Sequence, residues 1–218
     1  RQARRGGCAD RIRPDNVHDY APVGCLENTM VGNDRSGTVD CNPNLLKAME
    51  LALTGGRDLL PAADPMTGKR DPIRRDGPDT GDPTRFRDFE AFFSAFEIQV
   101  RHLLHRTADL YEHTDTLRAE LAPTPYLSCL VRGCAASGRD VTEGGAELSF
   151  VTMEAVTFAS TVDALLALRY LVFEERVCTL SELRQALVDN WVGHEVRQAR
   201  ARHRAPKYGR DDPAADAL

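Results

Sequence analysis

Hydrophobic residues recur at intervals of three and four over residues 84–121, which is the period of one face of an α-helix. The repeat is formed largely by phenylalanine, and its members are Phe86, Phe89, Phe92, Phe93, Phe96, Val100, Leu103 and Leu104. An apolar stripe of this kind normally packs into a protein core. We therefore predict a long amphipathic helix over residues 84–121, with its phenylalanines in the core and not in a ligand site.

A second helical pattern begins after Asn44. Leu45, Met49 and Leu53 lie on one helical face, and Gly55 follows the last of them. Asparagine is a favoured residue at the start of a helix, and glycine is favoured just beyond its end. We therefore predict a helix that Asn44 caps and that ends before Gly55.

Three further helices are predicted in the second half of the chain. Residues 126–137 form a short one, and residues 157–174 and 179–203 form two longer ones. The last opens with Thr179 and has Glu182 three residues later. This spacing indicates a capping box, in which the two residues satisfy each other's backbone amides.

The remaining segments favour loops. Residues 14–43 and 57–84 are rich in proline, glycine, asparagine and aspartate. Only one segment alternates as a buried strand does, and its residues are Leu148, Phe150 and Thr152 alternating with Glu147, Ser149 and Val151. The pattern therefore predicts a mostly helical chain with one buried strand.

Composition excludes several classes of protein. With 42% hydrophobic residues, 28% charged residues and a net charge of −5, the chain has the composition of a globular protein and no basic footprint for nucleic acid. No apolar stretch approaches the roughly 20 residues of a membrane span, and no signal peptide is recognisable. The six cysteines are irregularly spaced, which favours free thiols in a reducing compartment over a framework of disulfides. We expect a cytoplasmic protein that binds neither membrane nor nucleic acid.

Cys25 and Glu27 are the first candidates for chemistry. Gly24 permits a tight turn just before Cys25 in a loop where a ligand can approach. If the segment is extended, the two side chains point to one face about 6–7 Å apart, so one small substrate can touch both. A thiol that abstracts or attacks and a carboxylate that moves a proton can share such a reaction. From spacing alone, a structural role for Cys25 as a small loop residue is favoured over a catalytic one.

Residues 23–27, Val-Gly-Cys-Leu-Glu, resemble the Gly-Cys-Val-Glu finger loop of glycyl radical enzymes. Other segments resemble motifs of the same family in the same order: residues 47–56, 80–83, 86, 89–90, 95–96, 144–146, 162–167, 171–175, 205–209 and 211–212. The resemblance covers nearly the whole chain from about residue 18. The chain therefore resembles the pyruvate formate-lyase superfamily, in its dehydratase or lyase branch.

This resemblance implies an α/β fold, in which a ten-stranded barrel is surrounded by helices. Residues 1–218 would form part of the catalytic domain, with the cysteine finger loop at about residues 18–43 and a mostly helical remainder. The resemblance implies that the N-terminal half-barrel and the C-terminal glycyl radical domain are absent from these 218 residues. We therefore expect an incomplete segment of a longer enzyme, inactive by itself.

The resemblance also implies a mechanism. In this family an activating enzyme that uses S-adenosylmethionine and an iron-sulfur cluster installs a radical on a glycine. The position matching the catalytic cysteine is Cys25, whose thiyl radical would take hydrogen from a small-molecule substrate and trigger cleavage of a C–O, C–N, C–S or C–C bond. Glu27 would act as general acid or base. The segment would bind no cofactor or metal directly, and the full-length enzyme of anaerobic metabolism would be a homodimer.

Departures from the family pattern leave the subfamily open. Pyruvate formate-lyase has two adjacent cysteines in its finger loop, whereas Gly24 and Leu26 flank Cys25 here. Asn28 stands where the dehydratase branch commonly has proline. Two alternatives are kept: C–C cleavage of the formate C-acetyltransferase type, and a non-catalytic truncated remnant.

Glu147 and Glu154 are possible substrate-pocket residues, because both lie on or near the predicted strand. A further carboxylate in the pocket would suit a decarboxylase or a dehydratase. Alternation equally allows both side chains to face solvent or a helix.

A metal-binding helical domain is a rival from another class. His102 and His105 share a helix face with the spacing of two metal ligands, but no third ligand is evident. Cys129 and Cys134 are five residues apart and do not share a helix face well. We therefore predict no metal site.

Overall fold

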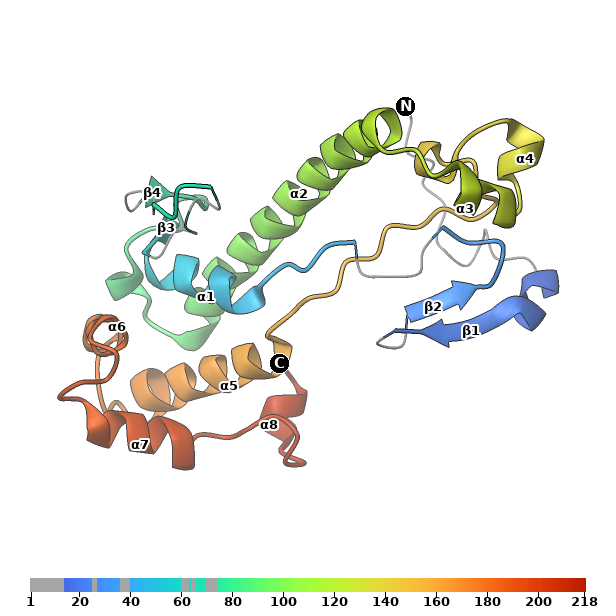
Figure 1. The fold of residues 1–218 in the computed structure, drawn as a ribbon. Coiled ribbons are helices and arrows are strands. Elements are labelled where there is room, and N and C mark those ends of the chain that lie inside the picture. The colour runs from blue at the N-terminus through green and yellow to red at the C-terminus, as the bar shows by residue number, and fades with distance from the viewer. Residues whose placement is uncertain (1–13, 25–26, 36–39, 60–62, 64–65, 70–73) are drawn as a thin grey trace. The chain divides into compact units, whose positions relative to one another are not determined.

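The computed structural model describes residues 14–24, 27–35, 40–59, 63, 66–69 and 74–218. The chain divides into two compact units: unit 1 comprises residues 1–42 and 107–154, and unit 2 comprises residues 43–106 and 155–218. Helices predominate among the described residues of both (Figure 1).

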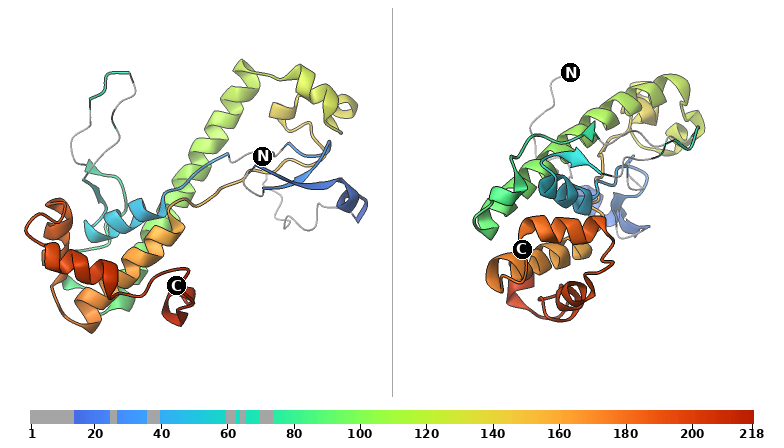
Figure 2. Two further views of the ribbon diagram at one scale, coloured as in Figure 1. Left: turned by 60° about the horizontal axis from the view of Figure 1, so that its bottom comes forward. Right: turned by 90° about the vertical axis from the view of Figure 1, so that its left-hand side faces the viewer.

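Unit 2 is built almost entirely from helices. Its elements are α1 (Leu45–Leu53), β3 (Arg57–Asp58), β4 (Arg74–Arg75), the 3₁₀ turn η3 (Pro83–Arg85), the part of α2 (Phe89–Leu121) up to residue 106, α5 (Phe158–Leu168), the π-helical turn η5 (Arg169–Glu174), α6 (Leu180–Val188), α7 (Glu195–His203) and α8 (Pro213–Asp216). Helices α5 and α7 lie side by side, and α1 packs against α5 (Figure 2).

The core of unit 2 joins α1, α2, α5 and α6. Its buried residues are Ala48, Met49, Ala52, Leu53, Phe89, Phe92, Phe96, Leu165, Leu168, Leu171, Cys178, Leu180 and Leu183. The phenylalanines of α2 therefore occupy the core position that their spacing predicts.

Unit 1 has smaller elements. These are the 3₁₀ turn η2 (Pro14–Asp19), β1 (Tyr20–Val23), β2 (Glu27–Met30), the part of α2 from residue 107, α3 (Pro125–Leu130), α4 (Cys134–Ser137) and the 3₁₀ turn η4 (Val141–Glu143). Its apolar cluster consists of Val131, Cys134 and Val141, with Ala146 packed against them. So small a cluster leaves much of the stabilisation to hydrogen bonds.

Asp140 is the centre of these hydrogen bonds. Its carboxylate accepts from the Ser128 hydroxyl at 2.7 Å and from the backbone amides of Thr124 at 3.0 Å and Thr142 at 2.9 Å. Burial alone would raise the pKa of this carboxyl group, but the hydrogen bonds hold its pKa far below the usual value. Asp140 thus joins the start of α3 to η4 as an ionised acceptor.

The helix predicted after Asn44 is confirmed as α1. The Asn44 side chain accepts a hydrogen bond from the amide of Lys47 at 3.2 Å. Gly55 follows the helix with a φ of 62°, in the left-handed region where glycine is favoured.

The long helix is also confirmed, although α2 begins at Phe89, later than predicted. The Asp88 side chain accepts a hydrogen bond from the Ala91 amide at 2.8 Å, which starts the helix there. Residues before this cap belong to η3 and a short extended stretch. Phe92 and Phe96 are buried as predicted.

Residues 126–137 do not form one helix, because Gly133 separates α3 from α4. Gly133 has a φ of 100°, and a Cβ there would lie 2.7 Å from the backbone nitrogen of Glu147. A side chain would clash, so the chain bends where only glycine fits. Gly138, with a φ of 64°, ends α4.

The prediction of one helix over residues 179–203 is also wrong, because a turn divides the segment into α6 and α7. The capping box is confirmed, since Thr179 and Glu182 exchange hydrogen bonds at 3.2 and 2.8 Å. Asn190 and Trp191 then adopt left-handed backbone conformations, with φ of 50° and 66°, and separate α6 from α7. The helix predicted over residues 157–174 is confirmed as α5 followed by η5.

The predicted strand around Leu148 is wrong as a regular strand. Leu148 and Met153 are linked to Asp34 and Cys41 only by isolated parallel bridges. The two bridges span unequal lengths of chain on the two sides, so a continuous ladder cannot form between them. Within the described residues the sheets are two antiparallel pairs, β1 with β2 and β3 with β4, and no ten-stranded barrel is formed by them.

Candidate functional site

The described residues on either side of Cys25 form the β1–β2 hairpin. The register pairs Tyr20 with Met30 and Val23 with Glu27, so the three residues 24–26 connect the strands. Gly24 has a φ of 57°, a left-handed conformation that suits glycine. Cys25 lies outside the described residues. Glu27 is the first residue of β2, opposite Val23.

Asn33 fastens the base of this hairpin. Its side chain is fully buried (0% exposed), and its Nδ2 donates to Oδ2 of Asp19 at 3.2 Å, just before β1. Its backbone amide donates to the Met30 carbonyl at 2.9 Å, and the Val31 amide donates to the Asp19 carbonyl at 2.8 Å. The two ends of the hairpin are therefore held together at one residue.

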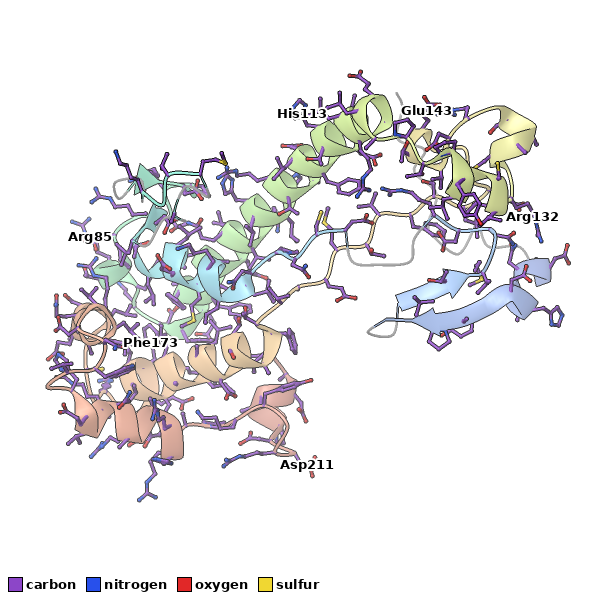
Figure 3. All side chains as sticks on the ribbon, viewed as in Figure 1. Arg85, His113, Arg132, Glu143, Phe173 and Asp211 are labelled. Carbon is purple, nitrogen blue, oxygen red and sulfur yellow. The ribbon has the colours of Figure 1, made fainter. Side chains whose placement is uncertain are left out.

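The segment after the hairpin pairs with the segment that carries Glu147. The Leu148 amide donates to the Asn33 carbonyl at 2.9 Å, and the Arg35 amide donates to the Leu148 carbonyl at 3.0 Å. The Glu147 amide donates to the Arg132 carbonyl at 2.8 Å. Arg132 follows α3 (Figure 3). Backbone hydrogen bonds thus position both segments without depending on side chains.

Arg35 is the polar centre of unit 1, with a side chain only 10% exposed. Its guanidinium donates to Oδ1 of Asp115 at 3.1 Å and to the Phe150 carbonyl at 3.3 Å, and it lies 3.7 Å from Oδ1 of Asp40. It also lies over the ring of Tyr111, 5.6 Å from the centroid. One buried cation therefore links the segment after the hairpin, the Leu148 segment and α2.

Tyr111 lies between the two carboxylates of this cluster. Its hydroxyl is 3.2 Å from Oδ1 of Asp40 and 3.4 Å from Oδ1 of Asp115. Burial raises the pKa of the phenol, although nearby Arg35 opposes the rise. The neutral hydroxyl can donate its single proton to only one carboxylate at a time, and Arg35 balances the other.

A groove of about 760 Å³ borders this cluster. Arg35, Asp40, Cys41, Tyr111 and Thr142 are among its lining residues. Burial, together with the neighbouring Asp40 carboxylate, raises the pKa of Cys41, so its sulfur is a neutral thiol at neutral pH. The groove is therefore lined by both polar and apolar side chains, and the described cysteine in it is a neutral thiol.

The two further carboxylates lie near this region in the chain. Glu147 is exposed and Glu154 is half-buried, while Leu148 between them is buried. The Glu154 amide donates to the Cys41 carbonyl at 3.0 Å. Their placement relative to Cys25 stays a prediction, because Cys25 is outside the described residues.

The rival metal site would use His102, His105, Cys129 and Cys134. His102 Nε2 is 2.9 Å from the carbonyl oxygen of Asp76, which engages that ring nitrogen. Cys129 is exposed, whereas Cys134 is buried. Among the residues that the structure describes, no three histidine, cysteine, aspartate or glutamate side chains group as metal ligands. Nor does that part of the chain contain a helix long and apolar enough to cross a membrane.

The sequence analysis missed the cluster of Arg35, Asp40, Tyr111 and Asp115. Tyr111 and Asp115 are four residues apart on α2, so their shared face was detectable from the spacing. Their partners Asp40 and Arg35 lie 71 and 80 positions earlier in the chain, so no local sequence pattern indicates these contacts.

Comparison with known proteins adds an independent finding. Residues 4–218 match the family model described as pyruvate formate lyase-like. The chain is 32% identical over 209 residues to (2S)-3-sulfopropanediol dehydratase of Klebsiella oxytoca, a match that covers 94% of this chain and 24% of that protein. The chain spans about a quarter of the length of the curated relatives it matches.

Solved structures give the same result for the fold. The glycerol-bound B12-independent glycerol dehydratase of Clostridium butyricum matches with a TM-score of 0.80 and 28% identity, over 96% of this chain and 25% of that one. A glycyl radical enzyme from Archaeoglobus fulgidus matches with a TM-score of 0.78 and 27% identity, over 96% and 25%.

Proposed function

The chain belongs to the pyruvate formate lyase-like family, and we propose that it is the cysteine-bearing segment of a glycyl radical dehydratase. The observation that supports this proposal is the register of the β1–β2 hairpin, which pairs Val23 with Glu27, the residues that flank the Gly-Cys-Leu sequence on either side. The sulfopropanediol and glycerol dehydratases among the similar proteins support a small hydroxylated substrate and C–O cleavage.

In the proposed mechanism, Cys25 carries the hydrogen atom transfers. A glycyl radical in the longer protein supplies one-electron chemistry by accepting the hydrogen atom of the Cys25 thiol. The sulfur radical then takes a hydrogen atom from a substrate C–H bond beside a hydroxyl group, which re-forms the thiol and leaves a carbon radical. After elimination, the Cys25 thiol returns a hydrogen atom to the product radical.

Glu27 is proposed to move the proton that the elimination requires. Its carboxylate takes the proton from the hydroxyl on the radical carbon and gives it to the hydroxide leaving the neighbouring carbon, which departs as water. The proton and the hydroxide balance as one water, so no external acid is consumed. Glu147 and Glu154 are proposed as further pocket residues.

The remaining parts of the enzyme are also proposals. The β1–β2 hairpin is a two-stranded sheet among the described residues, so its outer edges present backbone groups that a further strand can pair with. We propose that strands of the longer protein complete a ten-stranded barrel around this hairpin. A radical S-adenosylmethionine activating enzyme would be its partner, and the full-length form would be a homodimer in the cytoplasm.

The decisive experiment uses the full-length protein that contains this segment, after activation. Cys25→Ser is expected to abolish turnover, because a hydroxyl hydrogen is too strongly bound for the exchange. Cys41→Ser is the matched control, since it makes the same substitution at a cysteine to which the proposed mechanism gives no role, and it is expected to leave turnover unchanged. Substantial activity in the Cys25→Ser variant would contradict the mechanism.

Glu27→Gln separates proton transfer from radical formation. The variant is expected to keep the glycyl radical signal in electron paramagnetic resonance but to lower kcat by about 100-fold or more. An unchanged kcat would remove Glu27 from the proposal. Turnover of pyruvate instead of a hydroxylated substrate would favour the alternative of C–C cleavage.

A further inference from the structure

A second groove, of about 600 Å³, lies within unit 2, away from the hairpin residues in the sequence. It is formed by the loop after α1, by the segment that leads into η3, and by α6. Its lining residues are Thr54, Gly55, Arg57, Leu59, Arg75, Asp79, Gly81, Asp82, Pro83, Arg184, Gln185 and Val188. The groove includes most of the Thr-Gly-Asp-Pro motif at residues 80–83, for which the proposed radical chemistry has no role.

Close backbone packing fixes the shape of this groove. Gly55 has a φ of 62°, and a Cβ there would lie 2.9 Å from the Gly81 carbonyl oxygen. At Gly56 a Cβ would lie 2.4 Å from the Pro78 carbonyl oxygen. Both positions therefore require glycine, and the loop that carries Arg57 is held against the Thr-Gly-Asp-Pro segment.

The two carboxylates of the groove already have partners. Asp79 accepts from the Gly81 amide at 3.0 Å and from Arg75 at 2.7 Å. Asp82 accepts from the Thr84 hydroxyl and amide at 2.7 and 2.9 Å. These hydrogen bonds lower the pKa of both carboxyl groups, so both stay ionised at neutral pH and keep their hydrogen-bond donors.

The arginines of the groove are paired less closely than its carboxylates. Arg57 and Arg184 are exposed, and among the described residues neither forms an ion pair within 4 Å, although Arg57 helps to lower the pKa of Asp79 and Arg184 that of Asp82. Together with Arg75, the groove has three arginines against two carboxylates, in a chain whose net charge is −5. The lining of the groove therefore carries an excess of one positive charge, whereas the whole chain has a net negative charge.

We propose that this groove binds a small phosphate-bearing molecule. Guanidinium groups match phosphoryl oxygens with two parallel hydrogen bonds, and a phosphate monoester carries about −1.5 to −2 charges at neutral pH, where a carboxylate carries one. Arg57 and Arg184 hold the phosphoryl oxygens, and the apolar surface of Leu59, Pro83 and Val188 contacts the remainder of the ligand. The site does not depend on the radical chemistry.

Isothermal titration of the full-length protein that contains this segment with inorganic pyrophosphate tests the site. We expect saturable binding at one site, weakened at least about tenfold by Arg57→Gln and by Arg184→Gln, because each removes charged hydrogen bonds. Arg202→Gln is the matched control, since Arg202 is exposed on α7 and does not line the groove. It makes the same charge change and is expected to leave affinity unchanged. Far-UV circular dichroism of every protein confirms that it is folded.

Three outcomes would overturn the proposal. The folded native chain shows no saturable binding at millimolar pyrophosphate, or Arg202→Gln weakens binding as much as the groove variants do. Citrate, titrated as a carboxylate of comparable charge, binds as tightly as pyrophosphate and responds identically to the groove variants. The last result would replace phosphate by carboxylate as the recognised group.

Discussion

The two units of this chain are stabilised in different ways. The main core of unit 2 contains thirteen buried hydrophobic residues, whereas the cluster of unit 1 contains three among the described residues. Unit 1 relies instead on Asp140, Asn33 and Arg35, whose hydrogen bonds and ion pairs have fixed directions. Apolar burial tolerates small shifts, but hydrogen bonds specify geometry. The unit that holds the proposed catalytic hairpin is therefore the one built from directional contacts.

The largest effect is expected in the core of unit 2. Phe92 is fully buried, so Phe92→Ala should lower the free energy of unfolding by about 3–5 kcal/mol. Thermal unfolding followed by far-UV circular dichroism measures it. Val196→Ala is the control, because Val196 is exposed and its truncation should change little. A small effect at Phe92 would show that the core is not formed as described.

A somewhat smaller effect is expected at Asp140 in unit 1. Asp140→Ala leaves the amides of Thr124 and Thr142 and the hydroxyl of Ser128 without their acceptor, at a cost of about 2–3 kcal/mol. Hydrogen exchange should accelerate at the amides of residues 124–145 and stay unchanged in unit 2. Glu143→Ala is the matched control, since Glu143 is exposed. Equal acceleration in both units would contradict the comparison.

Arg35→Ala should have a more moderate effect, of about 1–2 kcal/mol, because Asp115 is partly exposed and water can replace some of the lost contact. Combining Arg35→Ala with Asp115→Ala in a double-mutant cycle isolates the interaction. Additive losses would mean that the ion pair contributes nothing. Arg118→Ala, at an exposed arginine that lines the same groove, is the control.

The smallest effect is the pH dependence that arises from Asp140. Its folded-state pKa is lowered, so its contribution is fully present above the unfolded pKa of about 3.9 and is lost as pH falls below that value. The free energy of unfolding of unit 1, measured by hydrogen exchange over a urea series, should therefore decrease below about pH 4. In Asp140→Asn this part of the pH dependence should disappear. Its persistence would assign the dependence to other carboxyl groups.

Sequence reasoning succeeded where the signal is local. Asn44, Thr179 and Glu182 act as the caps that their spacing indicates, and the phenylalanines of α2 face the core. A cap is defined by three or four consecutive residues and an amphipathic face by a short repeat, so neither requires knowledge of distant partners.

Sequence reasoning failed where distant contacts decide. Gly133 breaks a predicted helix because the backbone of Glu147 passes close to it, and this approach is invisible in the local pattern. Arg35 meets Asp115 across 80 residues, and neither residue type announces a partner. For the candidate site, the strands on either side of Cys25 were not predicted, and the finger loop and the pairing of Cys25 with Glu27 stay predictions.

The left-handed turn between α6 and α7 has a practical consequence. It contains Trp191, the single tryptophan of the chain, and places that side chain against the apolar core of unit 2. Indole fluorescence therefore reports on one unit alone. Emission spectra recorded during denaturation with selective excitation of the indole would follow unit 2 alone, because unit 1 contains tyrosines but no tryptophan, and this needs no label.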